Sequence, residues 1–172
     1  MSGSIMLPED IKRQWPVVEE GATSAGRTPD RNEWRIARHV FVADTPEKAR
    51  EGAMETFGKP FKHLEQYRAE AVAAKAKGKA PATDEESRGG DEAKAGRART
   101  LESMMENIWI VGDPDECAAK IRSLYELVGG FGYVLSVTYD PDDHSIMKRS
   151  VELLATEVVP RLEDLSPVGA AS

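Results

Sequence analysis

A chain of 172 residues is long enough to bury one hydrophobic core and is expected to form a single domain. Its formal net charge of −7 argues against nucleic acid as the default partner, because phosphate binding depends on an excess of lysine and arginine. Cys117 is the only cysteine, which excludes an intrachain disulfide and a zinc cluster built on thiolates. No window approaches the roughly 18 apolar residues that a membrane helix needs, so we expect no membrane partner.

The first 31 residues are expected to be irregular, with turn formers at Gly21, Gly26 and Pro29. A short helix over Glu9 to Glu20 stays open as an alternative, although Pro16 weakens it. The opening stretch MSGSIMLPEDIKRQW lacks the uninterrupted apolar region of a signal peptide, and we therefore expect a cytoplasmic protein.

The stretch WRIARHVFVADTPEKAREGAMETF predicts a strand followed by a helix. Trp34 to Val42 carries aromatic and β-branched residues, with apolar side chains on alternate positions, as in a strand. Thr45 can cap the next helix, with Pro46 at its first position, where a missing N–H costs nothing. The helix is expected to run to about Phe57 and to end at Gly58.

A polar segment then separates the two orderly parts of the chain. Residues 68–99 are dominated by Ala, Gly, Lys, Glu and Arg and have almost no large apolar side chain. A stretch of this length without a face to bury is usually an active-site lid or a disordered linker. Both interpretations stay open.

A second helix and strand follow. After a short apolar run over Ile108 to Val111, Asp113 can cap a helix, with Pro114 at its first position and Glu116 completing a capping box. Glycines 129 and 130 are expected to stop that helix. The next segment, Tyr133 to Tyr139, is predicted to be a buried strand of a parallel sheet. Two helical stripes are expected to be buried, the first comprising Cys117, Ile121, Leu124, Tyr125 and Val128, the second Ile146, Met147, Val151, Leu154 and Val158.

The alternation of strands and helices predicts a helix-rich, parallel α/β architecture. Only two strands are well marked, however, and two parallel strands cannot form an open doubly wound sheet or a closed barrel. The chain is therefore short of strands for the fold class that its pattern indicates.

The segment from Val111 to Leu165 resembles the C-terminal end of the bacterial luciferase-like flavin monooxygenases. The upstream stretch WRIARHVFVADTPEKAR is similar to a late strand and helix of that family, and the sequence is most similar to the branch that includes limonene-type monooxygenases. The matching motifs are Gly112 with Pro114, the turn Gly129-Gly130-Phe131, and the ending Val158, Pro160 and Leu162.

This resemblance implies a TIM-type (β/α)₈ barrel, which usually needs about 250 residues. The chain would supply its last two βα units, as an incomplete barrel. The implied organisation is an irregular segment over 1–31, the barrel part over 32–165 with a flexible lid-like insert at 68–99, and a disordered tail over 166–172.

The resemblance also implies the chemistry. Reduced FMN and O₂ would oxygenate a small organic substrate, and a flavin reductase would be a further partner. With so few strands, the chain is expected not to retain FMN or turn over by itself, and to self-associate or to pair with a complementary N-terminal half. Two alternatives stay open: a non-catalytic interaction module, and an independent domain capped by Ile5, Leu7 and Trp15.

Two aromatic residues are candidates for flavin contact by the resemblance. Phe61 follows the first helix, and Tyr139 lies at the end of the last strand, where barrel enzymes place site residues. The alternatives are an ordinary core aromatic for Phe61 and a packed strand-end tyrosine for Tyr139. Asp140 is interpreted as a turn or cap residue.

The remaining candidate motifs point away from other chemistries. His39, His63 and His144 lack the spacing of metal ligands, so no metal site is expected. The glycines at 129, 130 and 132 precede a strand, whereas a dinucleotide fingerprint follows one. They are interpreted as a helix stop and a close backbone approach. We expect Cys117 to be a small buried hydrophobe and not a reactive thiol.

Overall fold

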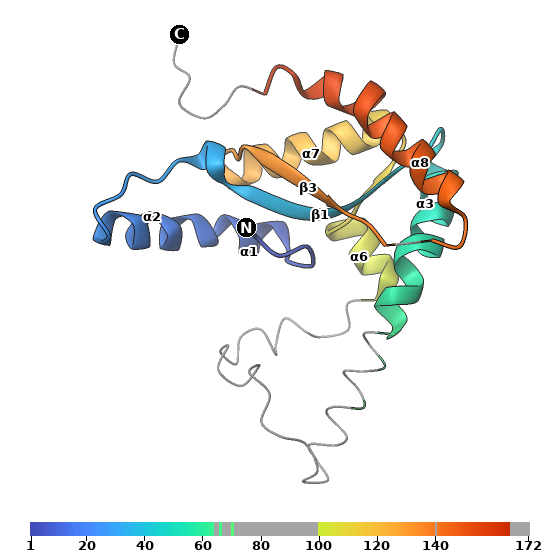
Figure 1. Ribbon diagram of the computed structural model, residues 1–172, viewed down its shortest axis with the longest axis horizontal. Helices are drawn as coiled ribbons and strands as arrows, with labels where there is room; N and C mark the ends of the chain where they lie inside the picture. The colour runs from blue at the N-terminus through green and yellow to red at the C-terminus, as the bar shows by residue number, and fades with distance from the viewer. Residues whose placement is uncertain (64–65, 67–69, 71–99, 140, 166–172) are drawn as a thin grey trace.

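The structure is a computed structural model that describes residues 1–63, 66, 70, 100–139 and 141–165 (Figure 1). The insert at 68–99, expected to be a lid or a linker, lies almost wholly outside the described residues. Asp140 and the tail over 166–172 also lie outside them. In the described part, no helix is long and apolar enough to cross a membrane.

The N-terminal segment, which we expected to be irregular, is largely helical. It forms α1 (Pro8–Lys12) and α2 (Gln14–Ser24). Pro16 does not break α2 because it lies in the first turn, where backbone N–H groups have no intrahelical partner.

This segment also packs on the rest of the chain. Ser2 forms an isolated parallel bridge to Ile36. Trp15 is buried, and its ring lies 5.1 Å from that of Trp34. Ile5 and Leu7 pack against a buried cluster farther along the sheet. The N-terminal segment is thus a cap on the fold, as the independent-domain alternative required.

Three parallel strands form the sheet, one more than the sequence marked clearly. They are β1 (Arg35–Val42), β2 (Ile110–Gly112) and β3 (Tyr133–Val137), in the order β2-β1-β3. Three residues of β1 are paired with β2, and five are paired with β3. The third strand is β2, which lies in the short apolar run before Asp113. At three residues it is too short to be recognised as a strand from the sequence pattern.

The strand order is not that of a closed barrel. In a (β/α)₈ barrel consecutive strands are neighbours, so β2 would lie beside β3. Here β1 lies between them. The three-stranded parallel sheet agrees with part of a barrel, while its order is not sequential. A physical reason lies in strand length, because eight-residue β1 offers β3 more hydrogen bonds than three-residue β2 can.

The helices after β1 begin at the predicted caps. Thr45 caps α3 (Pro46–Ala53), which continues as the π-helix η2 (Met54–Gly58). The expected end at Gly58 is wrong, because residues 59–63 are helical as well. A further helix, α6 (Leu101–Asn107), leads into β2. Asp113 then caps α7 (Pro114–Val128), and Gly129 ends it in the left-handed region at φ 79°. The last helix is α8 (His144–Leu153), followed by η4 (Leu154–Val158) and η5 (Val159–Leu162).

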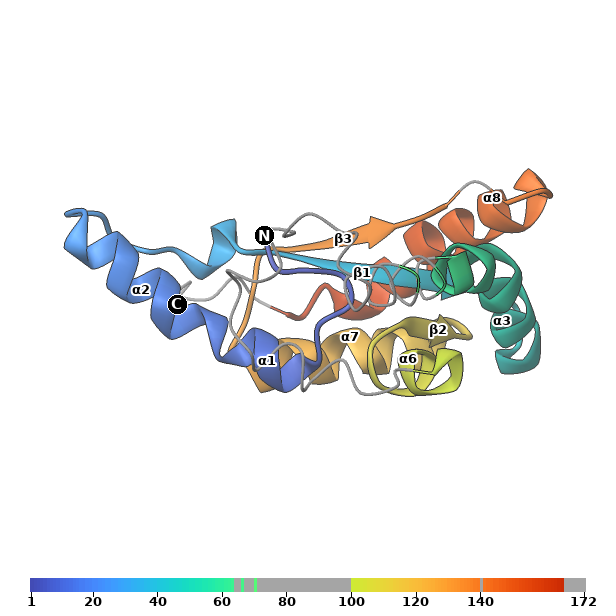
Figure 2. The same cartoon turned by 90° about the horizontal axis from the view of Figure 1, so that it is seen from below.

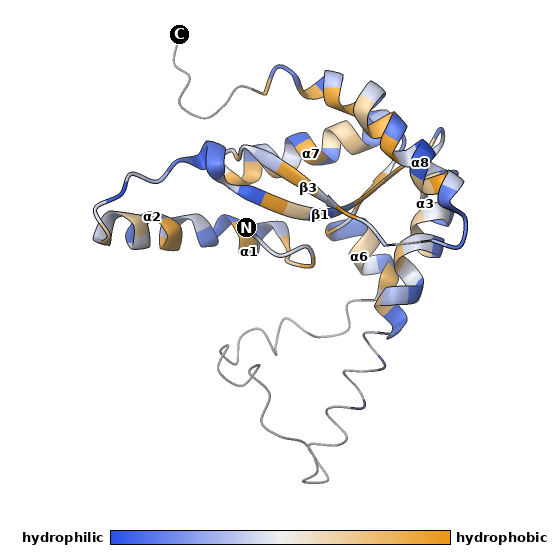
Figure 3. Cartoon of the chain, viewed as in Figure 1, coloured by the Kyte–Doolittle hydropathy of each residue, from blue (hydrophilic) through white to orange (hydrophobic). Residues whose placement is uncertain are grey.

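Side chains that alternate along β1 divide the core into two clusters. Figure 3 shows hydrophobic residues along β1 and α7. Ile36, Val40 and Val42 pack against α7 and the end of α8, and we call this side the α7–α8 face. Phe41 packs on the opposite side against α3, η2 and α6, and we call this the aromatic face. Figure 2 shows α7 running along the sheet with α1 beside it. Both faces of the sheet are therefore covered by helices, as in a parallel α/β architecture.

Two burial expectations were wrong. The last strand was expected to be buried on both faces, but β3 is an edge strand and Tyr133 is 49% exposed. In the last helix, Val151 is 50% exposed, whereas Leu153 and Val158 are buried. Both differences arise because no other element of the described chain packs over the exposed side chains of β3 and α8.

The turn before β3 depends on a glycine. The Gly132 N–H donates to the Trp34 carbonyl at 3.1 Å, and a Cβ at this position would lie 1.7 Å from the Asn32 carbonyl oxygen. This is the close backbone approach that the glycine pattern indicated.

We predict that Gly132→Ala lowers the free energy of unfolding by about 2–3 kcal/mol, because backbone must move to admit the methyl group. The matched control is Gly21→Ala in α2, where a Cβ would meet nothing within 4 Å. That change should raise stability by up to about 1 kcal/mol. Urea denaturation of both variants measures the difference, and equal stabilities would contradict the role of Gly132.

Candidate functional site

Six ring-bearing side chains gather on the aromatic face: Phe41 and five others, which we call the aromatic cluster. The five come from β1, η2, the helical residues 59–63 that follow η2, the residue before β2 and the segment just after β3. The Phe57 ring lies 5.1 Å from His39 and 5.4 Å from Trp109. The members are His39, Phe57, Phe61, Trp109 and Tyr139.

His39 is the centre of the cluster. Its imidazole is stacked on the Tyr139 ring at 5.5 Å with an interplanar angle of 19°, and Nε2 lies 3.4 Å from the Tyr139 hydroxyl. The side chain is only 3% exposed. Burial lowers the pKa of His39 to about 4; the Ser4 backbone opposes this shift, and the charge of Arg38 adds to it. His39 is therefore neutral at pH 7.

Three buried polar atoms on or beside the cluster have no hydrogen-bond partner among the residues that the structure describes: His39 Nδ1, Thr56 Oγ1 and Trp109 Nε1. Unpaired buried polar atoms are costly, and they are common where a ligand completes the hydrogen bonding. The cluster therefore combines flat apolar surfaces with unused polar atoms, which suits a planar heteroaromatic ligand.

A cavity of about 320 Å³ lies beside η2, and it is lined by neighbours of the aromatic cluster in the chain and not by its five members. Lys59 and Asp142 form an ion pair there, with Nζ 2.5 Å from Oδ2. Each partner shifts the pKa of the other: that of Asp142 is lowered and that of Lys59 is raised. The lining residues are Glu55, Thr56, Lys59, Pro60, His63, Pro141 and Asp142.

The fold brings both predicted flavin-contact residues into the same cluster. Phe61 packs edge-on against Trp109, with ring centroids 6.1 Å apart, and is partly buried. Tyr139 is 41% exposed and forms the accessible edge of the cluster. This packing also agrees with the two alternatives, an ordinary core aromatic for Phe61 and a packed strand-end tyrosine for Tyr139. Contact with flavin therefore stays a prediction.

Sequence reasoning missed the buried members of the cluster. His39 was considered only as a metal ligand. It alternates with Ile36, Val40 and Val42 along the strand, and this pattern already indicated that its side chain lies on the face opposite to theirs. His63 and His144 are exposed and lie outside the cluster. Among the described residues, no group of three or more His, Cys, Asp or Glu side chains could hold a metal ion. Cys117 is fully buried, as predicted, and burial raises its thiol pKa to about 12.

The depressed pKa of His39 predicts acid sensitivity. The unfolded chain binds the imidazole proton near pH 6.5, whereas the folded chain does so near pH 4. Lowering the pH from about 7 to about 4 should therefore remove up to about 3 kcal/mol from the free energy of unfolding. Urea denaturation across this range should show that His39→Leu loses this part of the pH dependence.

The matched control is His63→Leu, because the His63 side chain is exposed. This variant should keep the pH dependence of the parent chain. The same pH dependence in His39→Leu as in the parent would contradict the assignment to His39.

The sheet and the cluster define a parallel α/β unit with helices on both faces and an aromatic cluster between the sheet and the helices α3, η2 and α6. Its sequence matches the luciferase-like monooxygenase family over residues 3–130. The chain belongs to this family. The match begins well before Trp34, so it includes most of the N-terminal segment, which the resemblance found in the sequence did not cover.

Individual relatives agree with the family. The chain is 33% identical to 3,6-diketocamphane 1,6-monooxygenase of Pseudomonas putida, over 88% of this chain and 38% of that protein. It is 29% identical to limonene 1,2-monooxygenase of Rhodococcus erythropolis, over 92% of this chain and 36% of that protein. The predicted similarity to limonene-type enzymes is thus confirmed.

A solved structure extends the comparison to the fold. The oxygenating constituent of 3,6-diketocamphane monooxygenase from Pseudomonas putida, a type II Baeyer–Villiger monooxygenase in complex with FMN, matches with a TM-score of 0.64 at 32% identity. The match covers 87% of this chain and 39% of that structure. The chain therefore spans less than two fifths of the length of the relatives that it matches.

Proposed function

We propose that this chain supplies the C-terminal part of a flavin-dependent monooxygenase, which uses reduced FMN and O₂ to oxygenate a small organic substrate. The observation that carries the proposal is the similarity, in sequence and fold, to an FMN-bound oxygenating constituent. A flavin reductase would then be needed to supply the reduced cofactor.

The residues of the aromatic face fit the ring system of a flavin. Tyr139 and Phe61, at the edge of the aromatic cluster, would contact the isoalloxazine, and the unpaired Trp109 N–H is a donor for a ring heteroatom. Neutral His39 would hold Tyr139 in place by stacking. Bound reduced flavin would supply electrons to O₂, while these side chains orient it and exclude water.

The phosphate end of FMN is less well provided for. Near the cluster, Lys59 is already paired with Asp142. We therefore propose that the chain does not retain FMN by itself and that a complementary N-terminal half supplies the phosphate site and the missing strands.

Mixing the two halves tests this proposal. The partner would be the part of 3,6-diketocamphane 1,6-monooxygenase that precedes its aligned region. On gel filtration with excess FMN, we expect no flavin absorbance with the 172-residue chain alone and co-eluting flavin with the mixture. In the mixture, Tyr139→Leu and Phe61→Leu should each weaken FMN binding several-fold, because an aromatic contact contributes about 0.5–1.5 kcal/mol.

Tyr133→Leu is the matched control, since Tyr133 is exposed and lies against Arg35, outside the aromatic cluster. It should leave FMN binding unchanged. FMN that co-elutes with a monomer of the chain alone would contradict the need for a second half, and flavin-free mixtures would contradict the enzyme proposal.

The strand order leads to a second test of the same proposal. In a complete barrel with sequential strands, β3 would leave β1 and pair with β2. A disulfide between Ala37→Cys and Leu135→Cys, which are paired residues of β1 and β3, should lock the observed order and block FMN binding in the mixture. The background would be Cys117→Ala.

A disulfide between Val40→Cys and Ile110→Cys is the control, because β1 and β2 are neighbours in both arrangements. It should not block FMN binding. If both disulfides are tolerated equally, the proposed exchange of β3 is wrong.

One observation favours a second candidate, the non-catalytic interaction module. Val151 and Val159 are 50% and 52% exposed on the last helical segment, where they offer apolar surface for self-association or a partner chain. Flavin binding separates the two candidates, because an interaction module has no reason to bind FMN.

A further inference from the structure

Arg38 is a buried cation without a carboxylate partner. It lies on β1 next to His39, and its side chain is 1% exposed. Nη1 donates to the carbonyls of Gly3 and Ala37, each at 3.3 Å, and Nη2 is buried with no hydrogen-bond partner in the described part of the chain. No ion pair to Arg38 occurs among the residues that the structure describes.

This environment is unfavourable for a charged group. Two long hydrogen bonds to carbonyls do not neutralise a guanidinium, and a buried charge is normally paired or bound to a ligand. Burial lowers the pKa of Arg38 to about 10, so the side chain stays charged at neutral pH. An anion beside Nη2 would remove the penalty.

Space for such an anion lies next to the side chain. A cavity of about 290 Å³, near the lower end of the range for ligand sites, is bounded by α1, α6 and α7, and Arg38 lines it. Ile108, Leu124 and Leu127 make its walls largely apolar. A second cation, Lys120, also lines it, and its Nζ donates to the Val111 carbonyl at 2.7 Å.

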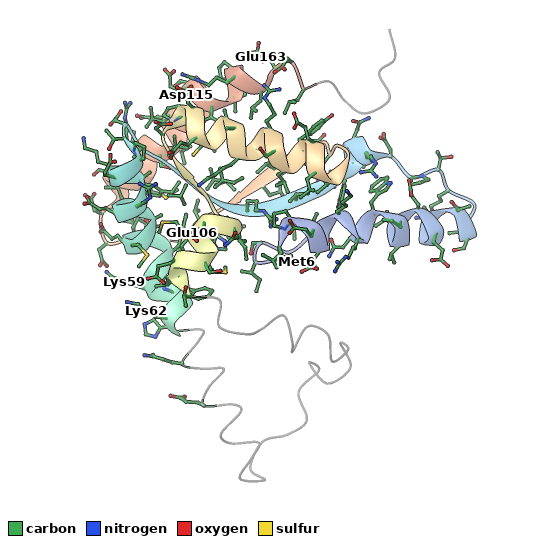
Figure 4. All side chains as sticks on the ribbon, turned by 180° about the vertical axis from the view of Figure 1, so that it is seen from behind. Met6, Lys59, Lys62, Glu106, Asp115 and Glu163 are labelled. Atoms are coloured by element: carbon green, nitrogen blue, oxygen red, sulfur yellow. The ribbon has the colours of Figure 1, made fainter. Side chains whose placement is uncertain are left out.

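We propose that this cavity binds a small monocarboxylate with a short apolar tail. The carboxylate would accept hydrogen bonds from Arg38 Nη2, and the tail would lie against the apolar walls. Glu9 and Glu106 also line the cavity, and Figure 4 shows Glu106 on α6. Their charges would disfavour ligands with two negative charges, which is why the proposal names a monoanion.

The site does not depend on the proposed flavin function. The residues that flank Arg38 in alternation, Ile36 and Val40, pack on the α7–α8 face, whereas the aromatic cluster lies on the other face of β1. Trp109 borders both places, so the two sites are neighbours through one residue.

The test is a calorimetric titration of the full 172-residue chain with hexanoate and with hexanamide, its neutral analogue, at constant ionic strength. We expect hexanoate to bind at least about tenfold more tightly, because hydrogen bonds to a charged group are stronger than neutral ones. Arg38→Met, which keeps the length of the side chain, should weaken hexanoate binding by at least about tenfold. It should leave hexanamide binding unchanged.

Stability separates a ligand site from a structural role. Without ligand, Arg38→Met should unfold at an equal or higher urea concentration than the parent, because it removes an unpaired buried charge. Arg35→Met on the same strand is the matched control, since Arg35 is exposed at the surface, and it should keep hexanoate binding.

Several outcomes would overturn the proposal. Equal binding of hexanoate and hexanamide, or unchanged hexanoate binding in Arg38→Met, would show that Arg38 does not recognise a carboxylate. Glu106→Gln or Glu9→Gln that lowers stability in the parent chain but not in Arg38→Met would show that the partner of Arg38 is a carboxylate of its own chain.

Discussion

The hydrogen bonding of β1 is the constraint on which the rest of the structure depends. This eight-residue strand has two edges, and every buried N–H and C=O along them needs a partner. At one edge, the three residues of β2 and the bridge to Ser2 supply these partners. At the other edge, the five residues of β3 pair along much of β1. The N-terminal cap and the strand order both follow from this demand.

The alternation of β1 places two unusual residues next to each other and on opposite faces. His39 is kept neutral by burial among aromatic rings, whereas Arg38 stays charged beside a cavity. A strand in a purely structural core would carry neither, since each leaves a buried nitrogen without a hydrogen bond. His39 belongs to the aromatic cluster, whereas Arg38 lies on the α7–α8 face, outside that cluster.

Membership of the luciferase-like family and the shortage of strands belong together. The chain matches proteins more than twice its length, and the sheet that it forms has the parallel direction of a barrel without its sequential order. β3 is the edge strand of the sheet, and Val151 on α8 is half exposed, so this side of the described chain presents apolar surface to solvent.

The sequence by itself determined the local elements: the caps at Thr45 and Asp113, the glycine stop at 129, the strand of β1, burial of Cys117 and the family itself. These depend on neighbouring residues or on short motifs, which a sequence displays directly. Only the tertiary structure decided the helical N-terminal cap, the third strand and its order, the exposure of β3 and the grouping of Phe61 and Tyr139 with His39 and Trp109. Each of those depends on contacts between residues far apart in the chain. The periodicity of a segment indicates a strand or a helix but does not indicate which other strand it pairs with.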